Sequence, residues 1–206
     1  MAPGTIAARM PERIPLDRHD TVVTVLREAA RVNADLEAYV EPAGERERRA
    51  LTFAQWDRAA EGVAGYLARH GVTKGDVVCL LLPSCIDYAV LYAALQRLGA
   101  ITSGINPRMG AAEVSSIVDR MSPVLIVADP AAATPPLGAH VELVGRAEIV
   151  AEWSGAPPER RLDLAGNDPV AVVWTSGTTG RPTVVATSSS GEVSAVPVPR
   201  EASVEV

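Results

Sequence analysis

Lysine is almost absent from this chain of 206 residues: 19 residues are lysine or arginine, and only Lys74 is a lysine. The pattern GxxxxGK[ST] is missing, which excludes a P-loop of that kind. Two cysteines, Cys79 and Cys85, are too few for a disulfide framework, and their spacing is not a usual metal-ligand spacing. We expect them to be small apolar residues of a reduced, cytoplasmic protein.

Long apolar runs and excess positive charge are also missing. No stretch approaches the roughly 20 apolar residues that a membrane span needs, and the first residues lack the apolar core of a secretory signal. The formal net charge is −6, so we expect no nucleic-acid partner. The composition that remains, 48% hydrophobic and 21% charged, is typical of one large globular domain or two small ones.

Apolar periodicity predicts an irregular start followed by alternating helices and strands. Residues 1–19 carry three prolines and no periodicity, so we expect an N-terminal arm. Asp20 is expected to cap the first helix, Thr52 with Gln55 to form a capping box at the start of the clearest helix, and Gly71 to end that helix. The other predicted elements are strands at 36–40, 77–82, 101–105, 124–128 and 169–174, helices at 86–98 and 111–121, and weaker segments near 141–144 and 148–153.

The alternation between residues 77 and 128 indicates a parallel sheet, because parallel strands need crossover connections. We therefore predict an α/β fold with a mainly parallel sheet and crossover helices. No GxGxxG pattern follows the first of these strands, so a standard dinucleotide site is not indicated. Tyr88 and Tyr92 are expected to pack on the sheet, and residues 106–108 to form a structural turn at a strand end.

The segment that suggests a ligand-binding function directly follows the strand expected at residues 169–174. Its glycines permit close backbone approach, and its successive N–H groups and hydroxyls can surround an anion at the end of a buried strand. Phosphate binding is the natural interpretation, and a ligand-free turn between strands is the alternative. The six residues are Thr175, Ser176, Gly177, Thr178, Thr179 and Gly180.

The sequence TSGTTGRP, beginning at Thr175, resembles the phosphate-binding signature of the adenylate-forming superfamily. This superfamily includes acyl-CoA synthetases, luciferases and peptide-synthetase adenylation domains. The stretch LTFAQWDRAAEGVAGYLARHGVTKGDVVCLLLPSCIDYAVLYAALQRLGAITSGINPR also resembles the opening of those enzymes, and the resemblance covers residues 20–182. It implies the first, incomplete subdomain of an AMP-dependent acyl-CoA synthetase or ligase.

The resemblance also implies a reaction. The family joins a carboxylic acid to ATP, releases pyrophosphate and leaves an acyl-adenylate, from which a thiol, usually coenzyme A, takes the acyl group. Its cofactors are ATP, Mg²⁺ and coenzyme A, and a role in fatty acid metabolism is expected. In the family the TSGTTG loop holds the β- and γ-phosphates, so Thr175, Ser176, Gly177, Thr178, Thr179 and Gly180 are the expected phosphate-binding residues.

The resemblance ends just after the motif. The family continues with Pro-Lys-Gly and later a Ser/Thr-His pair, but Thr183, Val184 and Ser189 stand at the lysine, glycine and histidine positions. Residues 183–206 contain no Leu, Ile, Phe, Tyr, Trp or Lys, and seven of the 24 are valine. We expect a non-homologous, disordered tail that arises from a shifted reading frame and an early stop.

Three segments are therefore expected: an arm at 1–19, a partial AMP-binding domain at 20–182 and a tail at 183–206. Because the family's acyl pocket and catalytic lysine are missing, we expect a truncated acid–thiol ligase that is inactive alone and binds none of the cofactors productively. Apolar surface left uncovered would favour aggregation or chaperone contact. The alternative is a small non-catalytic protein of the same origin that binds a nucleotide or a partner.

Overall fold

The computed structural model describes residues 11–43, 47–129, 132, 141–175, 183–188 and 193–194. Helices and strands alternate through most of them. The helices are η1 (Leu16–Arg18), α1 (Val22–Val32), α2 (Phe53–Arg69), α3 (Ile86–Leu98), α4 (Ala111–Met121), α5 (Arg146–Ala151) and η2 (Glu152–Ser154). The strands are β1 (Glu37–Glu41), β2 (Arg49–Thr52), β3 (Val77–Leu81), β4 (Ile101–Gly104), β5 (Leu125–Ala128), β6 (Glu142–Gly145), β7 (Pro169–Thr175), β8 (Thr183–Ser188) and β9 (Val193–Ser194).

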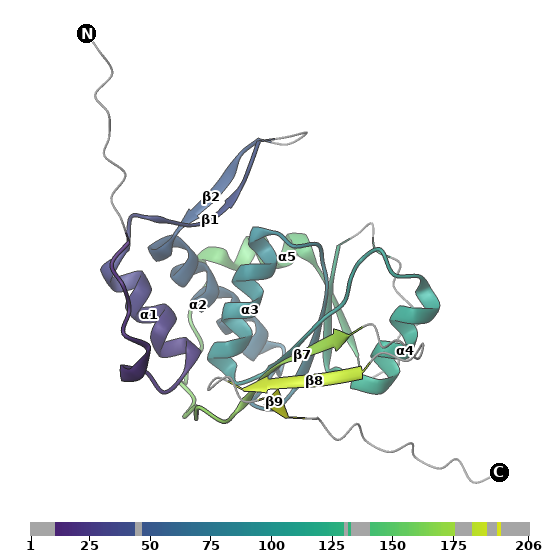
Figure 1. The fold of residues 1–206 in the computed structure, drawn as a ribbon. Coiled ribbons are helices and arrows are strands. Elements are labelled where there is room, and N and C mark those ends of the chain that lie inside the picture. Colours follow the sequence, from purple (N-terminus) through teal and green to yellow (C-terminus); the bar gives the residue numbers. More distant parts are fainter. Residues whose placement is uncertain are drawn as a thin grey trace, which may run out of the picture.

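The central sheet has the strand order β6-β5-β3-β4-β7-β8-β9. Neighbours from β6 to β7 run parallel, whereas β8 and β9 are antiparallel. The hairpin of β1 and β2 stands apart from this sheet and projects from the body of the molecule (Figure 1). The predicted α/β fold with a mainly parallel sheet and crossover helices is confirmed.

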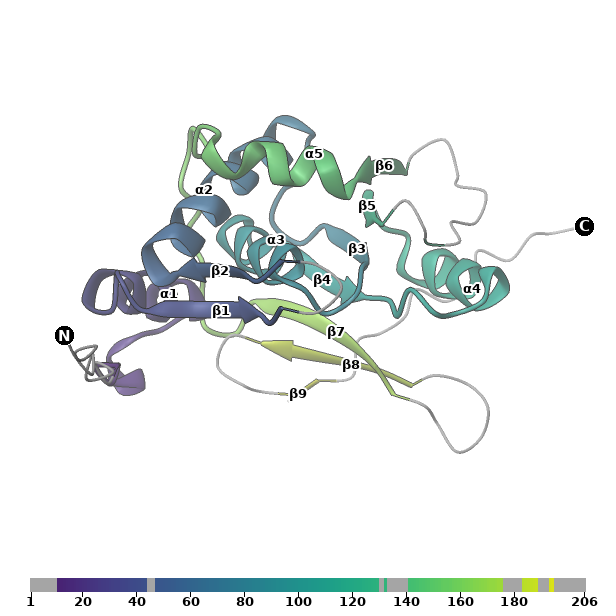
Figure 2. The ribbon, with the colours of Figure 1, turned by 90° about the horizontal axis from the view of Figure 1, so that it is seen from above.

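Side chains of β3 alternate between two apolar cores on opposite faces of the sheet, as the two-residue period of a strand requires. Val78 and Leu80 pack with α2, α3 and Ile149 of α5. Cys79 and Leu81 pack with residues of α4 on the other face. Figure 2 shows α2, α3 and α5 gathered together and α4 apart from them. The crossovers α3 and α4 therefore cover opposite faces of the sheet.

Local capping explains where the helices begin and end. The predicted capping box of α2 is confirmed: the Gln55 amide donates to Thr52 Oγ1 over 3.2 Å, and the Thr52 amide donates to Gln55 Oε1 over 2.9 Å. Helix α3 ends at Gly99, whose φ of 63° suits a residue without Cβ. The prediction that Asp20 caps α1 is wrong by one residue, because the Thr21 hydroxyl accepts from the Thr24 amide.

The backbone of η2 and of the connector that follows it crosses α2 at two glycines. A Cβ at Gly65 would lie 1.9 Å from the carbonyl oxygen of Ala156, and one at Gly62 would lie 2.3 Å from the carbonyl oxygen of Glu152. Both separations are far below a van der Waals contact, so only glycine admits this approach. The pair Gly62 and Gly65, one helical turn apart, thus forms a seat on α2 for the connector backbone.

The expected disordered tail is wrong for residues 183–188 and 193–194, which form β8 and β9. The run TVVATS of β8 is rich in β-branched residues, which favour extended backbone. It pairs antiparallel with β7, with Val184 opposite Trp174 and Ala186 opposite Val172. A sheet partner therefore orders a segment whose composition alone suggested disorder. The rest of the expected tail lies outside the described residues.

Lysine and cysteine, which are scarce in the sequence, have structural roles in the fold. Lys74 lies before β3, at the amino end of the sheet, where its Nζ is 2.6 Å from Asp168 Oδ2. Cys79 and Cys85 are free, and burial raises the pKa of the Cys79 thiol to about 12. No helix among the described residues is both long enough and apolar enough to cross a membrane.

Candidate functional site

The sheet has a topological switch point between β3 and β4. These two strands are parallel neighbours, but the chain leaves β3 toward α3 on one face and leaves β4 toward α4 on the other. The loops that follow them therefore diverge and leave a crevice at the carboxyl edge of the sheet. In open α/β sheets, ligands bind in such crevices.

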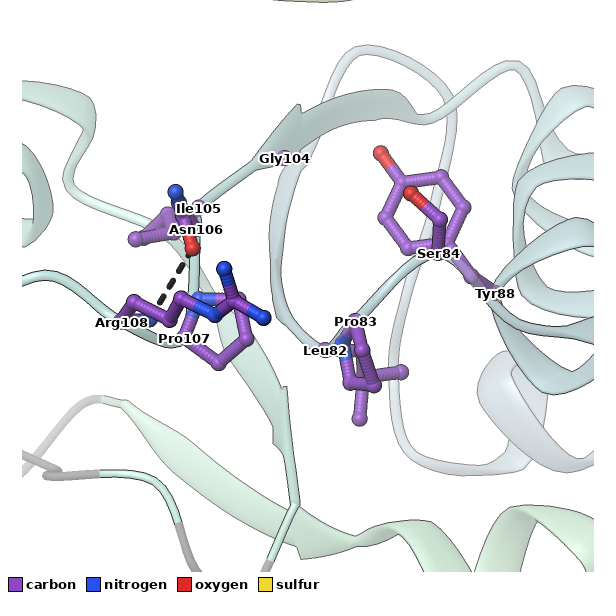
Figure 3. A pocket seen from close by; sticks show the side chains of 9 residues that line it. All are labelled: Leu82, Pro83, Ser84, Tyr88, Gly104, Ile105, Asn106, Pro107 and Arg108. Carbon is purple, nitrogen blue, oxygen red and sulfur yellow. Dashed lines mark hydrogen bonds between the residues drawn. The ribbon is translucent and has the colours of Figure 1, made fainter. Parts of the chain in front are cut away.

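A cleft of about 500 Å³ occupies this position. Figure 3 shows that the segment after β3 forms one wall and the segment after β4 forms the other. We call it the switch-point cleft, and its lining residues are Leu82, Pro83, Ser84, Tyr88, Gly104, Ile105, Asn106, Pro107 and Arg108.

The polar groups of the switch-point cleft suit an anion. The Arg108 amide donates to Asn106 Oδ1 over 3.0 Å, which shapes the turn after β4 (Figure 3). The exposed Arg108 side chain has no ion-pair partner among the residues that the structure describes. It is therefore a cation available to a ligand, with the Ser84 hydroxyl on the opposite wall.

Tyr88 links the cleft to the sheet. A Cβ at Gly104 would lie 2.6 Å from Tyr88 Oη, so the tyrosine occupies the space that this glycine leaves open on β4. Burial raises the pKa of Tyr88 above its ordinary value, so the phenol stays protonated at neutral pH. The expectation that Tyr88 packs on the sheet is confirmed, and its position in the cleft wall is an additional role.

An ion network around one buried carboxylate, Asp87, adjoins the wall formed after β3. Asp87, in the first turn of α3, has a side chain only 1% exposed. Arg49 Nη2 lies 2.9 Å from Asp87 Oδ1, and Arg146 pairs with Asp87 Oδ2. Arg146 Nη1 also lies 3.2 Å from Asp129 Oδ2, at the end of β5. The network joins β2, α3, β5 and α5 at the carboxyl edge, which fixes the start of α3 and hence Tyr88.

The sequence-predicted phosphate motif begins at the same edge of the sheet as the switch-point cleft. Ser103 of β4 pairs with Val172 of the parallel strand β7, so the two strands have their carboxyl ends at the same edge. Thr175 is the last residue of β7. The other five predicted residues, Ser176, Gly177, Thr178, Thr179 and Gly180, lie outside the described residues.

Sequence reasoning assigned residues 106–108 a structural role and did not identify the cleft. The missed residues are Ser84, Asn106 and Arg108. The sequence did contain a signal for the cleft. A proline closely follows each of the two apolar strands, at Pro83 and Pro107, so both strands end at the same edge of a parallel sheet. Recognising the cleft also requires knowing that α3 and α4 lie on opposite faces, which the right-handedness of crossover connections implies.

Comparisons with known proteins agree with this architecture. A family model described as AMP-binding enzyme matches residues 26–197. The chain is 37% identical to a long-chain-fatty-acid–CoA ligase, FadD13, of Mycobacterium tuberculosis (strain ATCC 25618 / H37Rv) over 170 residues, which cover 77% of this chain and 33% of the relative. It is 37% identical to 4-coumarate–CoA ligase 5 of Oryza sativa subsp. japonica over 157 residues, which cover 71% of this chain and 29% of the relative.

Solved structures show the same fold. The N-terminal domain of FACL13 from Mycobacterium tuberculosis matches with a TM-score of 0.72 and 30% identity, over 82% of this chain and 44% of that one. The N-terminal subdomain of NpsA from Klebsiella oxytoca matches with a TM-score of 0.72 at 18% identity, over 82% of this chain and 42% of that one, which bears on the fold alone.

The fold and the matches define the α/β architecture of the N-terminal subdomain of adenylate-forming enzymes. The chain belongs to the AMP-binding enzyme family, within which its relatives are acyl-CoA ligases. It spans about one third of the length of the curated relatives it matches. The family match extends to residue 197, past the end at residue 182 that the sequence resemblance suggested.

Proposed function

We propose that this chain is the nucleotide-phosphate-binding part of an ATP-dependent acid–thiol ligase, in which a carboxylic acid is activated as an acyl-adenylate before transfer to coenzyme A. One observation carries the proposal. Strand β7 ends at Thr175, the first residue of the TSGTTG motif, and its carboxyl end lies at the edge of the parallel sheet where the switch-point cleft also lies. Backbone amides and hydroxyls at that edge suit the charge of a polyphosphate.

The described residues of the switch-point cleft suit the phosphates of ATP but not Mg²⁺. Arg108, Asn106 and Ser84 supply a cation, an amide and a hydroxyl, which are groups that bind phosphate oxygens. Among the residues that the structure describes, none in the lining of this cleft carries a carboxylate, and carboxylate oxygens are the protein ligands that Mg²⁺ prefers. When ATP is bound, its triphosphate would supply the leaving pyrophosphate, and the protein would neutralise and orient the two negatively charged reactants.

We further propose that these 206 residues do not complete the reaction. This rests on the share of the relatives' length that they span and on Thr183 and Val184, which replace the lysine and glycine of the family pattern. The location we propose is the cytoplasm, in line with two free thiols.

A chimaera tests the function directly. Residues 20–182 would replace the matching part of the FadD13 relative, and carboxylate-dependent ATP–pyrophosphate exchange would be measured. We expect exchange in the chimaera and at least a roughly tenfold loss when Thr178 and Thr179 are both changed to alanine, because phosphate-binding hydroxyls are removed. A folded chimaera without exchange would contradict the proposal.

The 206-residue chain alone provides the complementary measurement. We expect neither ATP binding by calorimetry nor pyrophosphate exchange. Micromolar ATP binding without exchange would instead favour the non-catalytic nucleotide-binding protein. Genomic DNA gives an independent check: if the tail arises from a frame shift, another frame after the Pro182 codon should encode Lys-Gly and the remaining family motifs.

A further inference from the structure

A second concave site lies far along the sequence from the phosphate motif. It is a groove of about 570 Å³ between α1, α2 and the connector after η2, and we call it the α1–α2 groove. No described residue lines both this groove and the switch-point cleft. Its charged lining residues are Arg27, Arg31, Asp57, Arg58, Glu61 and Arg161.

The floor of the groove is electrically balanced. Buried Arg97 pairs with Asp57 and lies 3.3 Å from Glu61, and Arg27 lies 2.9 Å from the same Glu61 carboxylate. Two guanidinium groups therefore neutralise two carboxylates. The guanidinium of Arg31, at the rim, is neutralised by Glu28 at 2.7 Å.

The rim carries the excess charge. Arg58 on α2 and Arg161 on the connector are exposed, and neither has an ion-pair partner among the residues that the structure describes. Because the floor is neutral, these two arginines give the groove a local positive charge on a protein whose net charge is −6. Guanidinium groups bind phosphate with paired hydrogen bonds.

A separate observation points to a missing ligand atom. Arg27 Nε is buried and has no hydrogen-bond partner within the described part of the chain. A buried donor without an acceptor is costly, and native structures usually provide it with a protein atom, a water or an ion. The Arg27 side chain is 32% exposed and lines the groove, so a turn of its guanidinium toward an anion there would give this donor an acceptor.

We propose that the α1–α2 groove binds a small phosphate compound with more than one negative charge, such as inorganic pyrophosphate or a phosphate monoester. Arg58 and Arg161 contact the phosphate from opposite sides, one from α2 and one from the connector. The seat at Gly62 and Gly65 holds residues 152–157 against α2, and Arg161 follows this segment by four residues. The site is independent of the phosphate motif and of the proposed ligase activity.

Equilibrium dialysis of the 206-residue chain against labelled pyrophosphate at low ionic strength tests the proposal, and it does not require the protein to be monomeric. We expect saturable binding that the double variant Arg58→Gln/Arg161→Gln weakens roughly tenfold or more. Arg58→Lys/Arg161→Lys should give an intermediate affinity, because charge remains but the planar fork is lost. Added salt should weaken binding further.

Arg160→Gln is the matched control, because Arg160 is adjacent in sequence but lines a different groove. This control should leave the affinity unchanged. Arg108→Gln tests the switch-point cleft instead, and a loss of pyrophosphate affinity there as large as in the double variant would assign the binding to that cleft and overturn the proposal. Equal loss in Arg160→Gln, unchanged binding in the double variant, or no pyrophosphate binding at all would overturn the proposal. Sedimentation with phosphatidylserine vesicles in the absence of pyrophosphate binding would also overturn it, in favour of a membrane surface.

Discussion

Asp87 illustrates how one residue holds the carboxyl edge together. Its carboxylate is buried between the guanidinium groups of Arg49 and Arg146, which come from segments 38 and 59 residues away in sequence. Replacement by asparagine would leave two partly buried cations without their shared counterion. We expect Asp87→Asn to lower the free energy of unfolding by about 3 kcal/mol, because breaking a buried pair from one side is costly. Urea denaturation followed by circular dichroism measures this.

Asp119→Asn provides the comparison for Asp87, because Asp119 is exposed on α4 and makes no ion pair among the described residues. Its free energy of unfolding should change by less than about 0.5 kcal/mol. Similar losses in the two variants would show that the network at Asp87 contributes nothing special to stability.

Glu61 gives a pH-dependent prediction. Burial alone would raise the pKa of Glu61, but Arg27 and Arg97 outweigh it, so the pKa lies below the ordinary value of 4.5. The unfolded chain therefore binds the proton first as pH falls. Ionised Glu61 stabilises the fold above about pH 4.5, and this contribution disappears as pH falls through the folded-state pKa.

The variant Glu61→Gln should accordingly be less stable than the parent by about 2 kcal/mol at pH 7, and the difference should shrink at acid pH. Urea titrations between pH 7 and pH 3 measure it. Glu159→Gln, at an exposed position, should follow the parent at every pH. A constant difference between Glu61→Gln and the parent across this range would exclude titration of Glu61 as the cause.

At the scale of elements, the glycine seat on α2 predicts that a glycine-to-alanine change lowers stability, the opposite of its usual effect in a helix. Glycine to alanine inside a helix normally stabilises by up to about 1 kcal/mol, because alanine has the better helix propensity. At Gly65 the new Cβ would collide with the carbonyl oxygen of Ala156, which is backbone and cannot rotate away. We expect Gly65→Ala to destabilise by about 1–3 kcal/mol, as overpacking does, measured by thermal and urea denaturation.

Gly110→Ala is a suitable reference for the Gly65 variant. Gly110 precedes α4 with φ of −69°, and the nearest atom to a new Cβ there is the end of the Glu113 side chain at 3.7 Å. Because alanine is a poorer N-cap than glycine, Gly110→Ala should lower the free energy of unfolding, but by no more than about 1 kcal/mol. A stabilising Gly65→Ala variant would mean that the connector does not rest on α2 in solution.

Elements with local signals were predictable from sequence. Helices α3 and α4 were both predicted with their observed bounds, and Gly99 marked the end of α3. Strand β8 was missed because six residues rich in valine and threonine are ordered by pairing with β7, not by their own pattern. The phosphate motif is recognisable from six consecutive residues, but the switch-point cleft joins Ser84 to Arg108 across two strands, and no local pattern contains that juxtaposition.

At the scale of the whole molecule, β7 carries a feature unusual for an interior strand. Trp174 packs on the face of the sheet that α4 covers, so the preceding Val173 lies on the opposite face. Val173 is 49% exposed although β7 has β4 on one side and β8 on the other. The hairpin adds Tyr39 and Val40, which are 38% and 46% exposed. We therefore expect the isolated 206-residue chain to self-associate at micromolar concentration.

Val173→Lys should reduce this association, because a charge on the exposed face must be desolvated in any apolar contact, while the solvent-facing side chain leaves the core unchanged. Light scattering and sedimentation velocity across a concentration series measure the effect. Leu16→Lys removes an even more exposed apolar side chain, at 68%, from η1 at the other end of the described chain. Association that responds to Val173 and not to Leu16 would locate the contact on β7. A parent chain that stays monomeric and unfolds cooperatively would contradict the prediction, because the exposed apolar face of β7 would then not drive association.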